Sequence, residues 1–208
     1  MKDIVIADHH PITRKGIACL LKKHDGFKIV GKARDRTQLY EKLHKHKPDL
    51  LVLEIDMPKL GGINSIRSIK AEFPHVNVLV FSCHPQEIYA LSSIKSGAAG
   101  YVPKTAPNSV LLKAIKRTAK GGIYINEELT TGFTKHGKGQ RTALGHYKKL
   151  SSREIEVLNL LSSGKRNKDI ANTLHINEKT VSTYKTRMLK KLRVDNLADL
   201  IHQSRLFQ

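Results

Sequence analysis

Residues 48–58 read Pro-Asp-Leu-Leu-Val-Leu-Glu-Ile-Asp-Met-Pro, an apolar run that ends directly on acidic side chains. The four consecutive apolar residues Leu50–Leu53 are typical of a strand that is buried on both faces, because a half-buried strand alternates apolar and polar positions. Such strands belong to parallel sheets with helices on both sides. The stretch therefore predicts the centre of an α/β domain, with Glu54 and Asp56 beyond the carboxyl end of the strand.

Predicted strands alternate with predicted helices across residues 1–122. Apolar runs predict strands at 4–7, 27–30, 50–53, 76–81 and 98–102, and helical periodicity predicts helices at 11–23, 37–46, 63–73, 87–96 and 107–119. The helix over 11–23 takes its spacing from Ile12, Gly16, Cys19 and Leu20. The predicted fold class is therefore a five-stranded parallel (βα)5 domain. Ligands bind such sheets at the carboxyl ends of the strands, where the sequence places Asp8, Glu54, Ser82 and Lys104.

The pattern changes after residue 122. Residues 123–149 carry glycines and many basic side chains with little periodicity, which predicts a flexible basic linker. Residues 150–208 show only helical signals, beginning with Ser151 or Ser152 before Glu154, the signature of a helix N-terminus. A short helix over 167–174, a turn and a longer helix over 178–192 predict a helix-turn-helix.

The longer helix, residues 178–192, has two different faces. Its apolar stripe consists of Val181, Tyr184, Met188 and Leu192, and we expect it to pack against the neighbouring helices. The opposite face carries cations and hydroxyls, namely Lys179, Ser182, Thr183, Thr186, Arg187 and Lys190. Because cations bind phosphates and hydroxyls reach base edges, this face predicts binding to double-stranded DNA.

The composition favours an anionic partner. The chain carries 37 Lys and Arg against 18 Asp and Glu, a net charge of +19, of which +11 falls in residues 1–120. This excess favours nucleic acid, although basic charge also occurs as plain solvated surface. No apolar run approaches the ~20 residues of a membrane span and no signal peptide is evident, so we expect a cytoplasmic protein without a membrane partner. Cys19 and Cys83 lack metal-ligand spacing and are predicted to be buried.

Residues 150–206 closely resemble the LuxR/FixJ-type DNA-binding domain of the NarL/FixJ family. The resemblance rests on Leu-Ser-Ser-Arg-Glu-Ile-Glu-Val-Leu over 150–158, Asn-Lys-Asp-Ile-Ala over 167–171 and Thr-Val-Ser-Thr-Tyr-Lys-Thr-Arg-Met over 180–188. It implies that the helix over 178–192 enters the major groove and that the last helix, 196–204, mediates homodimerisation. Base contacts are implied for Ser182, Thr183 and Thr186, and mainly phosphate contacts for Lys179, Thr180, Lys185, Arg187 and Lys190.

Residues 2–120 resemble the receiver domain of two-component response regulators, which has a flavodoxin/CheY-like fold. The resemblance rests, in chain order, on Asp8, Pro11, Met57-Pro58, Gly62, Ser82, Tyr101 and Lys104. In that family an aspartate three residues before Met-Pro accepts a phosphoryl group, and two acids after the first strand hold Mg²⁺. The resemblance implies that Ser82 and Lys104 bind phosphoryl oxygens and that Tyr101 is the aromatic that rotates.

Two positions depart from the receiver pattern. Glu54 stands where the phosphoacceptor aspartate is expected, and His9 replaces the second acid after Asp8. Mg²⁺ prefers oxygen ligands in near-octahedral geometry, so the imidazole weakens a metal site for which only Asp8 and Glu54 remain as weak candidates. The longer Glu54 side chain is expected to overshoot the point where Ser82 and Lys104 converge, and a misplacement of ~1 Å costs ~100-fold in such a reaction. We therefore expect no bound cofactor, and an atypical receiver without its phosphoacceptor aspartate.

Three interpretations of this pocket stay open. In the first, which we favour, phosphoryl transfer is lost and Glu54 pairs with Lys104 as a permanent negative charge. The regulator is then constitutively dimeric, or a partner, a ligand or protein abundance controls it. In the second, phosphorylation survives at an unusual residue such as Asp56. In the third, the domain is a structural or dimerisation scaffold; Asp8 is then a helix-capping or hydrogen-bonded acid and His9 a polar loop residue.

The sequence as a whole predicts a transcription regulator rather than an enzyme. We expect it to bind promoter DNA as a homodimer, largely independently of aspartate phosphorylation, with a sensor histidine kinase of a phosphorelay as a candidate partner. The alternative from another class is an interaction protein, which uses the degenerate receiver surface to bind a partner regulator and contacts DNA only non-specifically.

Overall fold

The computed structural model describes residues 1–125 and 150–205, and the chain divides into two compact units. Most of the segment predicted as a linker, residues 126–149, lies outside the described residues, so its flexibility stays a prediction. None of the described helices combines the length and apolarity that a bilayer crossing needs.

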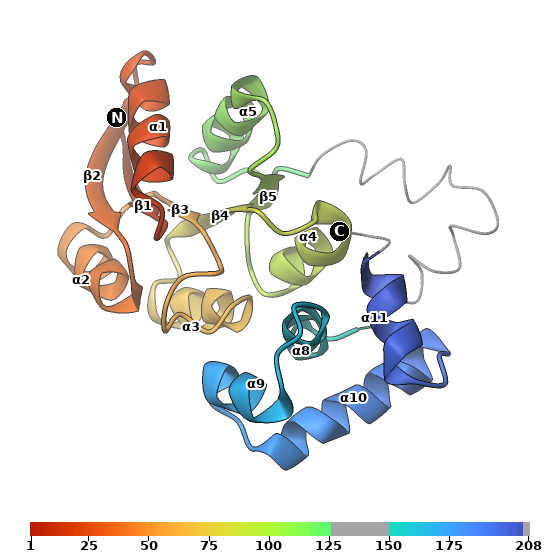
Figure 1. Cartoon of the computed structure of the whole chain (residues 1–208). Helices are drawn as coiled ribbons and strands as arrows, with labels where there is room; N and C mark the ends of the chain where they lie inside the picture. The colour runs from red at the N-terminus through yellow and green to blue at the C-terminus, as the bar shows by residue number, and fades with distance from the viewer. Residues whose placement is uncertain (126–149, 206–208) are drawn as a thin grey trace. The chain divides into compact units, whose positions relative to one another are not determined.

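The first unit is built on a five-stranded sheet (Figure 1). In chain order the elements of residues 1–125 are β1 (Lys2–Ala7), α1 (Pro11–Lys22), β2 (Phe27–Ala33), α2 (Arg36–His46), β3 (Leu50–Leu53), α3 (Asn64–Glu72), β4 (Asn77–Ser82), α4 (Gln86–Lys95), β5 (Gly100–Pro103) and α5 (Asn108–Thr118). The strand order is β2-β1-β3-β4-β5, and every neighbouring pair runs parallel. The predicted (βα)5 fold class is confirmed.

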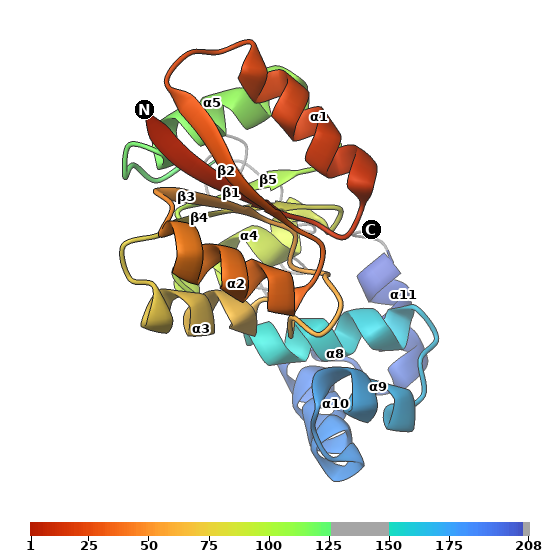
Figure 2. The ribbon, with the colours of Figure 1, turned by 90° about the vertical axis from the view of Figure 1, so that its left-hand side faces the viewer.

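Helices cover both faces of the sheet, which explains why β3 is apolar throughout. Figure 2 shows α1 and α5 on one side of the sheet and α2 and α3 on the other. Every residue of β3 is at most 1% exposed. Ile4 and Ile6 of β1 share one core cluster with Ile17 of α1 and Leu111 of α5. The side chains of β1 and β3 therefore have apolar neighbours instead of water. Each of these strands ends at the residue before an acidic side chain, Asp8 after β1 and Glu54 after β3.

The structure corrects the predicted apolar face of α1. Ile17 and Leu21 are the buried residues of this helix, whereas Ile12 is 78% exposed and Gly16 and Cys19 lie on the surface. Of the predicted set only Leu20 packs against the core, where it lies beside Ile17 and Leu21. These three large aliphatic side chains face the sheet because together they remove more apolar area from water than Ile12, Gly16 and Cys19 would.

The predicted burial of the two cysteines is wrong. Cys19 lies on the outer face of α1, opposite the stripe that packs on the sheet, and Cys83 follows the last residue of β4; both are exposed. A small apolar residue is not driven into the core when its backbone position faces outward.

Tyr124 extends the first unit beyond the predicted boundary at residue 122. Its backbone N–H donates to the carbonyl of Ala99 at 2.8 Å, it forms a bridge with Gly100, and its ring is buried in the core. A Cβ atom on Gly100 would lie only 3.0 Å from the Tyr124 carbonyl oxygen, so glycine allows this close approach.

The second unit contains the helices α8 (Ser152–Ser162), α9 (Asn167–Leu174), α10 (Glu178–Leu192) and α11 (Leu197–Arg205). Ser151 and Glu154 form the predicted capping box at the start of α8. His175 ends α9 in a left-handed conformation, and the Asn177 side chain accepts from the backbone N–H of Lys179 at the start of α10. These caps set the turn between the two helices, and α10 has the predicted bounds.

The apolar stripe of α10 is buried as predicted. Val181, Met188 and Leu192 are at most 2% exposed, whereas Tyr184 is only half-buried. The helix packs against α8, α9 and α11. Its opposite face is thereby fixed toward the outside of the helical unit.

Candidate functional site

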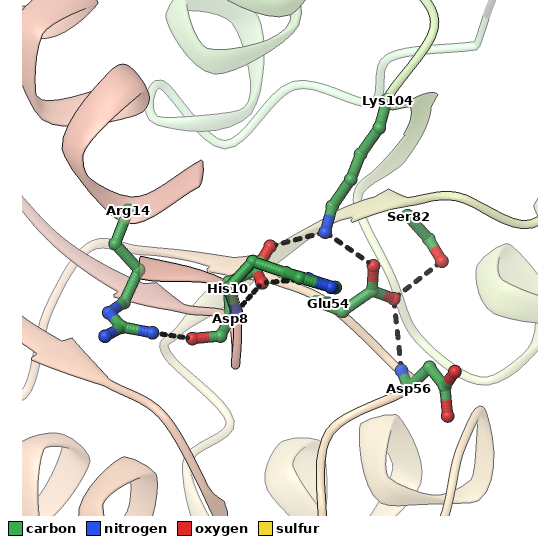
Figure 3. A network of polar contacts seen from close by, with 7 residues as sticks. All are labelled: Asp8, His10, Arg14, Glu54, Asp56, Ser82 and Lys104. Atoms are coloured by element: carbon green, nitrogen blue, oxygen red, sulfur yellow. Dashed lines mark hydrogen bonds and ion pairs between the residues drawn. The ribbon is translucent and has the colours of Figure 1, made fainter. Parts of the chain in front are cut away.

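The polar residues at the carboxyl ends of the strands meet in one place. Asp8 follows β1 and Glu54 follows β3, the two neighbouring strands at which the strand order changes direction. Crevices at such a switch point are the usual ligand sites of these sheets. Ser82 ends β4 and Lys104 follows β5, so the fold brings the predicted group together (Figure 3).

Lys104 lies between two carboxylates and pairs with both. Its Nζ atom is 2.6 Å from Asp8 Oδ2 and 2.9 Å from Glu54 Oε2, and each carboxylate side chain is only 2% exposed. Two adjacent buried carboxylates repel one another unless a cation lies between them. The ammonium group of Lys104 supplies that cation, and the predicted pairing of Glu54 with Lys104 is confirmed.

The second oxygen of Glu54 also has partners. Ser82 Oγ donates to Glu54 Oε1 at 2.6 Å, and the backbone N–H of Asp56 donates to the same oxygen at 3.1 Å. The prediction that the longer side chain overshoots Ser82 and Lys104 is therefore wrong, because the extra methylene carries the carboxylate directly onto both groups. The side chain of Asp56 is exposed and points away from Lys104 (Figure 3).

Asp8 holds the start of α1 through its other oxygen. Asp8 Oδ1 accepts from the backbone N–H of His10 at 2.7 Å and lies 3.1 Å from His10 Nδ1. Arg14, one turn into the helix, donates to the backbone carbonyl of Asp8. Sequence reasoning missed His10 and Arg14, although the position of His10 directly after His9 was an available signal.

The two acids also determine the protonation of Lys104. Burial lowers the pKa of the ammonium group, but hydrogen bonds and charge from Asp8 and Glu54 outweigh burial and raise the pKa above its ordinary value of 10.5. Lys104 is therefore charged throughout the neutral range. Tyr101, three residues earlier in β5, is 1% exposed and belongs to the core.

The pocket does not fit Mg²⁺. This ion needs a near-octahedral shell of oxygen atoms at short distances. Both oxygens of Glu54 and Oδ2 of Asp8 already have polar partners, and the Lys104 ammonium lies where a cation would bridge the two carboxylates. The next residue in the loop, His9, offers only ring nitrogens.

The second candidate site is the outer face of α10. The structure exposes Lys179, Ser182, Thr183, Thr186, Arg187 and Lys190, and leaves Thr180 and Lys185 half-buried. Within the described residues, no acidic side chain forms an ion pair with a lysine or arginine of this set. The face therefore presents positive charge that is available to an anionic ligand.

The helix itself orients the hydroxyls of this face. Ser182, Thr183 and Thr186 each donate to the backbone carbonyl one turn earlier, at 3.2, 2.9 and 3.2 Å. Each oxygen keeps lone pairs that accept from a base edge. Asn167 of α9 donates to Ser182 Oγ at 3.3 Å and accepts from Lys185 Nζ at 3.5 Å. Sequence reasoning missed Asn167, because it lies on a different helix from the residues that it contacts.

Polar contacts also hold α10 against α8. Lys191 Nζ lies 2.7 Å from Glu154 Oε2, which accepts from the backbone N–H of Ser151 at 2.6 Å. Burial raises the pKa of the Glu154 carboxyl, but the bonds from Lys191 and Ser151 outweigh it and hold the pKa below its ordinary value of 4.5. Arg153 of α8 donates to the carbonyl of Leu174 at the end of α9. These contacts fix the orientation of α10 and α9 relative to α8.

A (βα)5 domain with a polar pocket at its switch point, followed by a helix-turn-helix with a cationic outer face, defines the class of response regulators with a DNA-binding output. Residues 4–116 match the response regulator receiver domain, and residues 148–204 match the bacterial regulatory proteins of the luxR family. The chain belongs to the two-component response regulators that carry a LuxR-type DNA-binding domain.

Known proteins are similar to this chain over nearly its whole length. The oxygen regulatory protein NreC of Staphylococcus haemolyticus is 34% identical over 204 residues, covering 95% of this chain and 94% of the relative; NreC of Staphylococcus carnosus is 31% identical over the same shares. RcsB of Salmonella enterica serovar Typhimurium, solved bound to the promoter rprA with the phosphomimetic BeF3⁻, is 28% identical with a TM-score of 0.78, covering 97% of both chains. A structure of two RcsB dimers bound to two parallel DNAs is 29% identical with a TM-score of 0.78, covering 98% of both chains.

Proposed function

We propose that this response regulator binds promoter DNA sequence-specifically as a homodimer, and that binding does not depend on phosphorylation of an aspartate. The observation that carries the proposal is the outer face of α10, where exposed cations and hydroxyls stand opposite a buried apolar stripe. The helix packs on its own domain through one face and has the other face available for a major groove.

The side chains of α10 divide into two kinds of DNA contact. Thr183 and Thr186 are short, exposed hydroxyls near the middle of the helix, which suits contacts with base edges. Lys179, Arg187 and Lys190 are long exposed cations, which suits phosphates on either side of the groove. Half-buried Thr180 and Lys185 are better suited to backbone contacts than to base recognition.

The homodimer follows from the way in which single helices read DNA. One recognition helix covers only a few base pairs, and dimers of helix-turn-helix proteins bind two half-sites ~34–36 Å apart. The solved RcsB structure named above contains dimers on DNA, which supports the same arrangement for this chain. We assign the dimer contact to α11, whose Leu200 packs inward and whose Ala198 and Asp199 are exposed.

Independence from phosphorylation is supported by the contacts of Glu54 and Lys104. A phosphoryl group needs a nucleophilic carboxylate, a metal and a cation free to bind its oxygens. Here the residue at the acceptor position is Glu54, its two oxygens are engaged, and Lys104 already neutralises two acids. The atypical receiver then works as a domain with a permanent internal charge pair, and a sensor kinase is not needed for DNA binding.

The proposal includes no catalytic turnover and places the protein in the cytoplasm, where promoter DNA is found. The rival function is a partner-binding regulator that contacts DNA only non-specifically. Selection from a random DNA library with the untreated full-length protein separates the two. A sequence-specific regulator enriches a two-part motif and binds it about 10³-fold or more tightly than scrambled DNA. Without enrichment of any motif, the rival is correct.

Mass spectrometry tests the pocket separately. The protein is incubated with acetyl phosphate and Mg²⁺ and weighed, and no added mass of ~80 Da, one phosphoryl group, is expected. If such a mass appears and disappears in Glu54→Ala or Asp56→Ala, phosphorylation survives at that residue and this part of the proposal is wrong.

A further inference from the structure

Three consecutive residues at the junction of β1 and α1 bring metal-binding atoms together. Asp8, His9 and His10 each offer one ligand atom, and these atoms lie within 4.8 Å of one another. The rings of His9 and His10 are 3.7 Å apart between centroids and tilted by 42°. Asp8 is buried, His9 half-buried and His10 exposed, so the cluster runs from the pocket to the surface.

One nitrogen of this cluster lacks a partner. His9 Nδ1 is buried and makes no hydrogen bond with any other described residue. A buried polar atom without a partner is costly, and native proteins usually satisfy it with a protein group, water or an ion. The Nδ1 atom of the next residue, His10, lies 3.1 Å from Asp8 Oδ1, so the imidazole of His10 already faces the carboxylate of Asp8.

The ligand set selects the kind of metal. Two imidazoles and one carboxylate suit zinc and its neighbours in the first transition series, which bind three protein ligands and keep an open position for water. Mg²⁺ takes oxygen ligands and dehydrates reluctantly, so the same set suits it poorly. Replacing an acid by His9 thus changes the preferred metal as well as the affinity.

The contacts of the pocket leave Asp8 able to serve in this role. Asp8 Oδ2 pairs with Lys104, whereas Oδ1 accepts from the backbone N–H of His10 and faces the His10 ring. A carboxylate oxygen offers two lone pairs, so Oδ1 can keep the backbone hydrogen bond and bind a metal beside His10 while the ion pair stays.

We propose that Asp8, His9 and His10 form a binding site for one borderline transition-metal ion of the zinc class, in place of the magnesium site that the fold family has nearby. The site needs neither Glu54 nor a phosphoryl group. Metal binding would pin the β1–α1 junction, because His10 is the residue that directly precedes the first turn of α1. The proposal stands apart from the proposed DNA-binding function and is tested without DNA.

The test is calorimetric titration of the full-length protein with Zn²⁺, compared with His9→Gln and His10→Gln. Loss of either imidazole is expected to weaken the tightest site by about 10-fold or more. His24→Gln and His75→Gln, which replace a half-buried and an exposed histidine elsewhere in the same unit, are matched controls and are expected to leave it unchanged. A Cys19→Ser, Cys83→Ser background removes binding by the exposed thiols.

The same titration in a large excess of Mg²⁺ tests the choice of metal, and the zinc affinity is expected to stay the same. Co²⁺ then gives a visible absorption band whose intensity reports the coordination, and this band is expected to be lost in His9→Gln. The assignment is overturned if Zn²⁺ does not bind, or if His9→Gln and His10→Gln bind Zn²⁺ as tightly as the native protein. Displacement of Zn²⁺ by Mg²⁺ would overturn it as well.

Discussion

The outer face of α10 and the pocket of the first unit use basic side chains in opposite ways. On α10 the cations Lys179, Arg187 and Lys190 are exposed and have no acidic partner among the described residues. In the pocket, Lys104 is 12% exposed and pairs with two buried acids. A charge that is exposed and unpaired is available to a ligand, whereas a charge that is neutralised inside the protein contributes to the fold.

This difference separates the contacts that hold α10 from those of the pocket. The polar contacts that fix α10, such as Glu154 with Lys191, lie entirely within the helical unit. They involve no residue of the pocket, so we expect substitutions in the pocket to leave the outer face of α10 intact.

The largest expected effect is the loss of the pocket cation. Lys104→Met leaves Asp8 and Glu54 as adjacent buried carboxylates without their cation, and we expect the free energy of unfolding to fall by about 3–5 kcal/mol. Urea denaturation of the full-length protein measures it. Lys113→Met, at an exposed position of α5, is the matched control and should change stability by less than about 0.5 kcal/mol. Equal stability of the two variants would mean that the pair is not structural.

The next effect concerns recognition of DNA. Thr183→Ala with Arg187→Ala removes one hydroxyl and one cation from the outer face of α10, and we expect affinity for selected DNA to fall by about 2–4 kcal/mol, roughly 30- to 1000-fold. Fluorescence anisotropy with a labelled fragment measures this loss. Arg67→Ala with Ser68→Ala, an exposed pair on α3, should leave the affinity unchanged. Unchanged affinity in the first variant would rule out this face as the DNA site.

A smaller effect is expected where α8 holds α10. Glu154→Gln weakens the bond with Lys191 and the capping box, so we expect a loss of about 1–2 kcal/mol at neutral pH. Because the folded state lowers the pKa of Glu154, its contribution is present above pH 4.5 and is lost as the pH falls through the folded-state pKa.

Thermal denaturation between pH 7 and pH 3 checks this sign. The stability difference between the native protein and Glu154→Gln should shrink as the pH falls. Glu178→Gln, which replaces an exposed acid in the first turn of α10, provides the control. A difference that stays constant with pH would show that the charge of Glu154 does not stabilise the fold.

The smallest effect is expected from a single phosphate contact. Lys190→Ala should weaken binding to all DNA sequences by a similar factor, and should reduce the slope of log K against log salt concentration by about 1. Anisotropy titrations over a series of salt concentrations measure this slope. If only the selected sequence loses affinity, Lys190 reads a base instead.

Much of the fold was predictable because its local signals agree with one another. The bounds of α10 followed from a polar cap and an apolar stripe, and the parallel sheet followed from runs such as Leu50–Leu53. The buried face of α1 was not predictable, because two stripes of helical spacing compete and only the packed sheet decides between them. Cys19 was misplaced for the same reason.

The pocket was predictable in its membership but not in its geometry. Chain order and strand ends placed Asp8, Glu54 and Lys104 together, and the Glu54–Lys104 pair was expected. The 2.6 Å bond from Ser82 to Glu54, and the 2.7 Å bond from the His10 backbone N–H to Asp8, depend on the exact course of the backbone at the strand ends. Sequence spacing does not determine that course.

DNA binding before and after treatment with a phosphodonor tests the central claim most directly. Untreated protein, and protein incubated with acetyl phosphate and Mg²⁺, are titrated against the same selected fragment and against scrambled DNA. With Lys104 and Glu54 paired inside the pocket, both preparations should bind the selected fragment with the same affinity and the same preference over scrambled DNA. If the untreated protein shows no preference and the phosphodonor restores it, then the receiver still works by phosphoryl transfer and the account is wrong.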